Sequence, residues 1–537
     1  MIRVEELSFA YPKAAGPVLR GVNLSIPEGE AVLVVGPSGG GKSTLLRCLN
    51  GLVPHFHGGS FAGRVSVDGE DTLKHQPREL ARKVGLVFQD PESQFVADVV
   101  EDELAFGMEN MGVPRLTMRK RVEEVLDVLG IAHLRRRRLD TLSGGELQRV
   151  AIGAVLTVQP RVLVLDEPTS QLDPQAAEEV LTVVQRLNSD LGLTIVMAEH
   201  RLERVVQYVD RVLYMPGDGS VASYPVRQAM ERLPIAPPVA RIGRVLGWAP
   251  LPLSVREGKP FAKRSALPPL SDTRSDAGNS QASVVVEKAH LSYGDADVIR
   301  GVSLHAFPGQ VLALMGRNGA GKTSLLRSLV GLLAPRKGTV SVLGEDVVDS
   351  STEELTRRVA LVPQDPASIL FHDTIEGEIA DTLKGTGREG NVEEALAEWR
   401  LESLRRAHPR DLSAGERQRA ALAAMLVGRP PVILLDEPTR GMDYETKRLL
   451  MDNLRRRCRE GCTVILASHD VELVGSCADR VVLLAEGEVA AAGPTRDVLT
   501  ESLTFSTQVN KLFGDRYLTV EDVLAAEEME RIGASNS

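Results

Sequence analysis

Two stretches of the chain combine glycines, a lysine and a hydroxyl residue at a spacing suited to phosphate groups. The first runs from Gly36 to Ser43 and the second from Gly316 to Thr323, each with the pattern Gly-x-x-x-x-Gly-Lys-Ser/Thr. Glycines let backbone N–H groups turn inward around an anion, and a following helix adds partial positive charge at its N-terminus. In such a loop the lysine reaches the outer phosphates and the hydroxyl binds Mg²⁺. The predicted phosphate-binding residues are Gly36, Pro37, Ser38, Gly39, Gly40, Gly41, Lys42, Ser43, Thr44, Gly316, Arg317, Asn318, Gly319, Ala320, Gly321, Lys322, Thr323 and Ser324.

A pair of adjacent carboxylates follows a short apolar run in each half of the chain. The pairs are Asp166 with Glu167 and Asp436 with Glu437. Successive side chains at a strand end point in different directions, so the two members of a pair can have different roles. We predict that each aspartate completes a Mg²⁺ shell and that each glutamate, ionised at neutral pH, polarises an attacking water.

A third motif, Ser-x-x-Glu with glycines between, also occurs twice. A serine followed three residues later by a glutamate is a capping box, so each motif predicts the start of a helix. A glycine-rich helix N-terminus also attracts anions, and it could cap a γ-phosphate that is held elsewhere. The residues of the two motifs are Ser143, Gly144, Gly145, Glu146, Ser413, Ala414, Gly415 and Glu416.

The elements that position these motifs indicate a domain that occurs twice in the chain. The three motifs recur in the same order, which is the mark of a duplicated domain. Short apolar runs precede the glycine loops and the carboxylate pairs and are typical of buried parallel strands. We therefore expect an α/β fold with two domains, each with a mixed or parallel sheet and a helical subdomain. The expected strands are 31–35, 162–165, 194–198, 311–315, 432–435 and 463–467.

Changes in composition predict where the domains end. Prolines concentrate between the two copies, as in a semi-extended linker, and an amphipathic segment follows the second copy. The expected organisation is a first domain over 1–232, a proline-rich linker over 233–283, a second domain over 284–493 and a helical tail over 494–537.

The charge, cysteine and hydropathy patterns narrow the possible roles. The net charge is −10, and the only obvious basic run, Arg135 to Arg138, is interpreted as a solvated helix end, so we expect no nucleic acid partner. The four cysteines form no CxxC pair, which favours free thiols in a reducing compartment. No signal peptide or stretch of about 18 apolar residues is visible, so any membrane span would come from partners.

With leucine before the serine and Gln-Arg after the glutamate, the third motif makes each half resemble an ABC ATPase domain. The resemblance implies ATP and Mg²⁺ as cofactors. It also implies adenine stacking on Tyr11 and Tyr293, and aspartates of a domain-crossing loop at Asp173 and Asp443. The implied catalytic residues are Glu167, His200, Glu437, His469, Gln89 and Gln364, and the implied metal ligands are Ser43, Gln89, Asp166, Thr323, Gln364 and Asp436.

In this family two domains pair head to tail, so both could pair within this one chain. The resemblance then implies that Ser413 to Glu416 closes the site of Lys42 and that Ser143 to Glu146 closes the site of Lys322. Both sites keep the glutamate and the histidine, so we expect two hydrolysing sites. Ala414 in place of the usual glycine, together with Gln171 and Arg440 in the crossing loops, are the departures from the pattern.

The segment from Gln89 to Phe95, continued by 99–107, is similar to energy-coupling-factor importers of vitamins or metal ions, and the segment from Glu199 to Glu203 also fits that group. That resemblance implies an integral membrane coupling protein and a small substrate-binding membrane protein as partners, at the cytoplasmic face of the cell membrane. Two alternatives stay open. One is a fused sugar-type importer ATPase, and the other is a soluble tandem ATPase that acts on ribosomes or nucleic acid.

Overall fold

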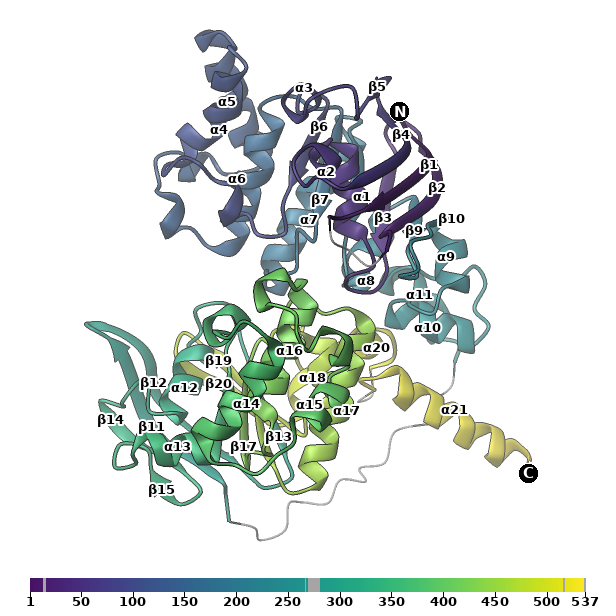
Figure 1. Cartoon of the computed structure of the whole chain (residues 1–537). Coiled ribbons are helices and arrows are strands. Elements are labelled where there is room, and N and C mark those ends of the chain that lie inside the picture. The colour runs from purple at the N-terminus through teal and green to yellow at the C-terminus, as the bar shows by residue number, and fades with distance from the viewer. Residues whose placement is uncertain (13–15, 266, 269–280, 515–516, 536–537) are drawn as a thin grey trace. The chain divides into compact units, whose positions relative to one another are not determined.

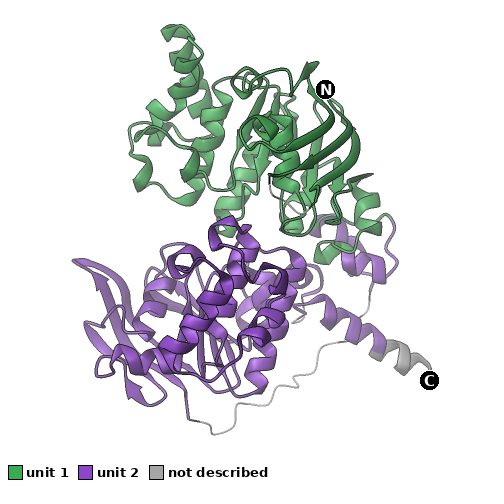
Figure 2. Cartoon of the chain, viewed as in Figure 1, with its two compact units in different colours: residues 1–240, 250–254 green, residues 241–249, 255–537 purple. Residues whose placement is uncertain are grey.

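A computed structural model of the chain describes residues 1–12, 16–265, 267–268, 281–514 and 517–535, with side chains described up to residue 528 (Figure 1). The chain forms two compact units (Figure 2). The first contains Met1–Ala240 and Pro250–Ser254, and the second contains Arg241–Ala249 and Val255–Ser537. Among the described residues, no helix is long and apolar enough to cross a membrane.

The first unit is built on a six-stranded sheet in the order β10-β9-β3-β8-β7-β6, parallel except for the β10–β9 pair. Its strands are β3 (Ala31–Val35), β6 (Val84–Val87), β7 (Val162–Asp166), β8 (Thr194–Ala198), β9 (Arg211–Tyr214) and β10 (Ala222–Pro225). An antiparallel sheet in the order β2-β1-β4-β5 lies in the same unit. Its strands are β1 (Ile2–Ala10), β2 (Leu19–Ile26), β4 (Ser60–Val67) and β5 (Glu70–Asp71).

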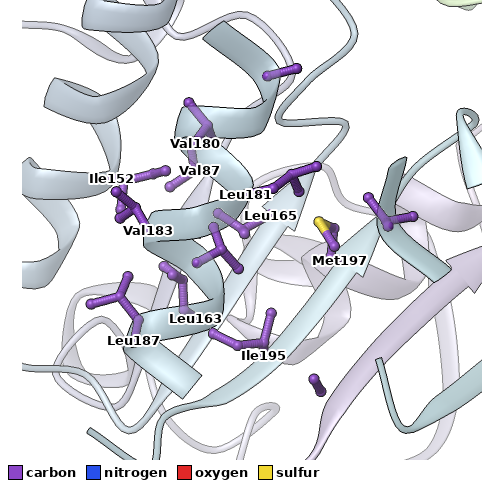
Figure 3. Packing of buried hydrophobic residues seen from close by; sticks show 14 of the residues in the cluster. Val87, Ile152, Leu163, Leu165, Val180, Leu181, Val183, Leu187, Ile195 and Met197 are labelled. Carbon is purple, nitrogen blue, oxygen red and sulfur yellow. The ribbon is translucent and has the colours of Figure 1, made fainter. Parts of the chain in front are cut away.

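Helices of the first unit cover the parallel sheet and form the expected helical subdomain. They are α1 (Lys42–Leu49), α2 (Leu52–His55), α3 (Pro77–Leu80), α4 (Val100–Asn110), α5 (Arg115–Val128), α6 (Gly144–Leu156), α7 (Pro174–Ser189), α8 (Leu202–Val205) and α9 (Val226–Arg232). Apolar residues three and four apart give α7 one buried face. Val180, Leu181 and Leu187 of that face gather with Leu163 and Leu165 of β7 in one buried cluster (Figure 3). Each such side chain contributes about 1.5–3 kcal/mol when fully buried.

The second unit repeats this plan. Its six-stranded sheet has the order β16-β17-β18-β13-β19-β20, and its antiparallel sheet has the order β12-β11-β14-β15. The strands are β11 (Val284–Tyr293), β12 (Ala296–Ala306), β13 (Val311–Met315), β14 (Lys337–Val342), β15 (Glu345–Asp346), β16 (Val359–Val362), β17 (Val432–Asp436), β18 (Thr463–Ala467), β19 (Arg480–Ala485) and β20 (Glu488–Pro494). The helices are α12 (Lys322–Leu329), α13 (Thr352–Arg358), α14 (Ile375–Thr386), α15 (Val392–Glu398), α16 (Ala414–Leu426), α17 (Tyr444–Arg459) and α18 (Val471–Cys477). The predicted α/β fold with two domains is confirmed.

The segment predicted as a linker has more structure than its prolines indicate. It contains α10 (Pro238–Val245) and α11 (Val255–Ala262), while residues 266 and 269–280 lie outside the described part. Leu251 and Leu253 are buried in the core of the first unit. Trp248 instead stacks on Phe261 of the second unit, with ring centroids 5.3 Å apart. The compact units thus divide this segment between them, because its apolar residues pack on two different cores.

Helices follow the second copy, as the amphipathic pattern indicates. They are α19 (Thr495–Thr500), α20 (Gln508–Phe513) and α21 (Val520–Ser535). The backbone N–H of Gln508 donates to Glu472 of α18 at 2.7 Å. The guanidinium of Arg496 donates to Asp522 at 2.6 and 3.1 Å. The first turn of α21 is therefore tied to α19, and the start of α20 is tied to the helix that follows His469.

The basic run Arg135 to Arg138 has a structural use at its first residue. The Arg135 guanidinium donates to Glu101 of α4 at 2.5 Å and to Glu123 of α5 at 2.6 Å. Arg405 of the second unit makes the matching pair of bonds, to Glu376 at 2.5 Å and to Glu393 at 3.3 Å. The repeat of this pattern shows that the arginine joins two helices of each helical subdomain.

Candidate ATP sites

The first glycine loop lies between β3 and α1, and its lysine is buried. The Lys42 ammonium donates to the carbonyl oxygens of Gly36 and Pro37 at 3.0 and 2.9 Å. A Cβ at Gly36 would lie 2.1 Å from the Met215 carbonyl oxygen. Gly41 has φ = 92° at the start of α1, a conformation that glycine adopts without strain. The loop backbone therefore requires glycine at both positions. The loop folds around the Lys42 ammonium and holds it through these two carbonyl groups.

The second glycine loop repeats the geometry between β13 and α12. The Lys322 ammonium donates to the carbonyl oxygens of Gly316 and Arg317 at 2.8 and 3.1 Å. Gly321 has φ = 99° and begins the helix. The predicted phosphate-binding residues of each loop are thus brought together in the form that the spacing indicates.

Each predicted metal-binding aspartate ends a buried strand beside the hydroxyl of its loop. The Thr323 hydroxyl donates to Oδ2 of Asp436 at 2.8 Å, and the Ser43 hydroxyl bonds to Asp166. Burial raises the pKa of both aspartates. The other oxygen, Oδ1, is buried in each without a hydrogen-bond partner among the described residues. A buried carboxylate oxygen of this kind fits a divalent cation, so these four residues suit Mg²⁺, which neutralises phosphate charge.

Glu167 joins the predicted catalytic residues of the first unit. Its Oε2 accepts from the Gln89 amide at 2.8 Å, and its Oε1 lies 2.9 Å from Nε2 of His200. The backbone of Glu167 has φ = 50°, in the left-handed region, and its N–H donates to Ala198 at 3.0 Å. Strained backbone of this kind persists where the surrounding structure enforces it, and it is frequent at functional sites.

Glu437 has the same backbone conformation in the second unit, with φ = 47°. Its Oε2 lies 2.8 Å from Nδ1 of His469, and the backbone N–H of His469 donates to the same oxygen at 3.3 Å. Gln364 follows β16 and is exposed, whereas Gln89 is partly buried. The two units therefore hold the same residue types in different contacts.

The capping boxes predicted at the third motif are present at the start of α6 and α16. Backbone N–H groups of Ser143 and Ser413 donate to the paired glutamates Glu146 and Glu416 at 2.7 and 2.8 Å. A Cβ on Gly145 would lie 2.8 Å from the Cβ of Ala176, so this glycine allows α6 to approach α7. Ala414, in contrast, is exposed, and it is accommodated without a change in the helix start.

The remaining predicted residues have contacts inside their own units. Asp173 and Asp443 cap α7 and α17, accepting from backbone N–H groups at 2.9 and 2.7 Å. The Tyr11 hydroxyl hydrogen bonds with that of Thr44 at 3.0 Å, which ties the tyrosine to the phosphate loop. Tyr293 is 43% exposed. Its hydroxyl accepts from Arg327 at 3.3 Å.

The sequence analysis assigned no site role to one residue beside the first site. Glu199 follows β8 and is 2% exposed, next to His200 and bonded to Thr169. The available signal was an acidic residue directly after the apolar run 194–198, in a place where the second copy has Ser468.

The comparisons with known proteins identify the family of the chain. The family model described as ABC transporter matches residues 19–170 and 299–440, together more than half of the chain. An ABC transporter ATP-binding protein of Streptomyces avermitilis is 48% identical over 98% of this chain and all of its own length. One from Methanosarcina mazei is 38% identical over 93% of this chain and 90% of its own.

A solved structure is similar over most of the chain as well. It is described as a model of ribosome-bound archaeal Pelota and ABCE1, and it gives a TM-score of 0.63 at 22% identity, covering 93% of this chain and 79% of the other. At that identity the likeness shows the fold alone. Two phosphate loops with strand-end carboxylates define a tandem P-loop ATPase. The chain belongs to the ABC transporter ATP-binding family and hydrolyses ATP.

Proposed function

We propose that this chain is the ATP-hydrolysing subunit of an importer of the energy-coupling-factor type. In this proposal the chain drives uptake of a small micronutrient, a vitamin or a metal ion, through separate membrane subunits. These are an integral membrane coupling protein and a small substrate-binding membrane protein, which would hold the chain at the cytoplasmic face of the membrane.

The observation that carries the proposal is an exposed apolar residue at the same place in both units. Val96 follows Gln89 in the first unit and is 64% exposed. Phe371 follows Gln364 by the same number of residues in the second unit and is 80% exposed. Apolar side chains held open to water at matching places favour a partner that covers them.

Buried carboxylates hold these two residues in place. Glu103 of α4 accepts from the backbone N–H groups of Val96 and Ala97 at 2.9 and 2.8 Å. Glu378 of α14 accepts from the backbone N–H of His372, beside Phe371. Both glutamates are 4% exposed. A rigid segment loses little conformational entropy on binding, so this arrangement suits a docking surface a few residues after each predicted catalytic glutamine.

We further propose that the two units pair head to tail, as the family resemblance implies. Ser143 and Ala414 are exposed at the N-termini of their helices, which supports a role for these termini in binding phosphate from the opposite domain. Each ATP would then lie between one glycine loop and the other unit's Ser-x-x-Glu motif, which we call the signature, at the start of α6 or α16.

The alternatives predict different partners. A fused sugar-type importer ATPase would bind a pair of similar permeases. A soluble tandem ATPase would bind ribosomes or nucleic acid, and the fold shared with a ribosome-bound protein keeps this alternative open.

A pull-down from native membranes in mild detergent, followed by mass spectrometry, tests the proposal. We expect two dissimilar, very hydrophobic proteins with the unchanged chain, and their loss with the double variant Val96→Glu, Phe371→Glu. The control is Leu191→Glu, Leu503→Glu, at sites that are 61% and 96% exposed and lie outside the segments after the glutamines. Recovery of ribosomal proteins or nucleic acid without membrane proteins would contradict the proposal.

A further inference from the structure

Glu199 is a buried carboxylate that joins two loops of the first site. Its Oε1 accepts from the backbone N–H of Thr169 at 2.8 Å and from the Thr169 hydroxyl at 2.6 Å. Its Oε2 accepts from the backbone N–H of His200 at 3.1 Å. One side chain thus bonds both to the loop after β7 and to His200, the second residue after β8.

These bonds connect the two residues of the predicted catalytic pair, Glu167 and His200, by a second route. Thr169 stands two residues after Glu167, and the imidazole of His200 contacts the Glu167 carboxylate. The distance between the strand-end loops is therefore fixed twice, by the contact of Glu167 with His200 and by the Glu199 bridge. A side chain locked in this way places a reacting group with less freedom to move.

Keeping a carboxylate at this place has an electrostatic cost. Burial raises the pKa of Glu199. The hydrogen bond from the Thr169 hydroxyl acts to lower this pKa, and the nearby Glu167 carboxylate acts to raise it further. Arg204 acts in the opposite direction, and its guanidinium lies 3.5 Å from the Thr169 carbonyl. A second buried acid beside a catalytic acid is tolerated when its hydrogen bonds compensate, as those to Thr169 and His200 do.

Among its described residues, the second unit has no carboxylate in the place of Glu199. Ser468 stands before His469, and its hydroxyl accepts from the backbone N–H of Asp470 at 3.0 Å. The Thr439 hydroxyl, equivalent to that of Thr169, is buried without a hydrogen-bond partner within the described part of the chain. The loop is braced differently, by an ion pair of 2.7 Å between Lys447 of α17 and Asp470.

We propose that Glu199 is a positioning residue of the first ATP site, which it tunes separately from the second by fixing His200 to the loop after the catalytic strand. The inference rests on the assignment of Glu167 and Glu437 as the bases of the two sites. It deepens that assignment, because it makes the two sites unequal for a physical reason.

The test measures hydrolysis at the first site alone, in full-length protein with Glu437→Gln. Glu199→Ser should lower kcat by about tenfold to a hundredfold and leave KM nearly unchanged, because hydrogen bonds to a charged group are lost while the phosphate loop stays intact. Glu199→Gln should be intermediate, since its carbonyl can still accept from Thr169 but its amide N–H group faces that of His200.

Matched threonine variants separate this role from general packing. Thr169→Val removes a hydroxyl bonded to Glu199 and should slow the first site several-fold. Thr439→Val, made with Glu167→Gln, removes a hydroxyl without such a bond and should leave the second site at its parent rate. Amide hydrogen exchange should be about tenfold faster in the segment 199–202 of Glu199→Ser.

Three results would overturn the inference. They are an unchanged first-site kcat in Glu199→Ser, equal losses in the two threonine variants, or unchanged exchange over 199–202. If the parent with Glu437→Gln does not hydrolyse ATP, turnover at the two sites is coupled and the rate of the first site cannot be read alone. The exchange measurement then still decides whether Glu199 holds the His200 loop.

Discussion

The backbone at Glu167 and Glu437, the two predicted bases, has an unusual conformation that the sequence pattern does not indicate. Both adopt φ near +50°, and both backbone N–H groups bond to the neighbouring strand. A non-glycine residue in this region costs about 1–3 kcal/mol. In this conformation the carboxylates of Glu167 and Glu437 lie 2.9 and 2.8 Å from a histidine nitrogen.

The double variant Glu167→Gln, Glu437→Gln should abolish turnover and leave ATP bound. Glutamine keeps the shape of the side chain and its contact with the histidine, but it cannot polarise water as a carboxylate does. Phosphate release and equilibrium binding of a fluorescent ATP analogue measure the two effects. Single variants serve as controls, and undiminished hydrolysis in the double variant would refute the assignment of the bases.

At the scale of elements, a partly buried carboxylate joins two of the tail helices, α21 and α19. Asp522 accepts two bonds from Arg496 and one from each backbone N–H of Leu518 and Thr519. Burial acts to raise the pKa of Asp522, but these donors outweigh it and leave that pKa lowered. The ionised form is therefore the one that holds α21 in place.

Asp522→Asn should lower the local stability of the tail by about 1.5–3 kcal/mol, because charge-assisted bonds are lost. Hydrogen exchange over 505–528 measures it, and Glu528→Gln, at an exposed position of the same helix, is the matched control. Because the folded pKa is depressed, this stability is present above the ordinary aspartate range. It is lost as pH falls through the folded value, below about pH 4. Equal exchange in both variants would exclude the carboxylate as the anchor.

At the scale of the whole molecule, the proposed pairing assigns each signature helix to the other unit's ATP. Ser413→Arg should impair the site of Lys42 and spare that of Lys322, because a bulky cation would replace a small cap at the γ-phosphate. Labelling of each site with a photoreactive ATP analogue measures the effect. Ser143→Arg should give the converse, and loss at the Lys322 site with Ser413→Arg would refute the pairing.

The sequence by itself determined the duplicated α/β plan, the two phosphate loops, the strand-end carboxylates and the capping boxes. Each of these features depends on residues within a few positions of one another. Their backbone geometry follows from glycine freedom, helix capping and apolar runs, and all of these act over short range. The loops at Gly36 and Gly316 and the helix starts at Ser143 and Ser413 lie where their spacing indicates.

Only the tertiary structure decided the partners of residues far apart in the chain. One example is the bond between Glu199 and Thr169. Others are the bonds of buried glutamates to the backbone at Val96 and beside Phe371, and the division of the proline-rich segment between two cores. A spacing pattern does not indicate which buried group will form a hydrogen bond with a given carboxylate. That choice is made when strands and helices pack, because a buried polar group must find its hydrogen bonds within the folded interior.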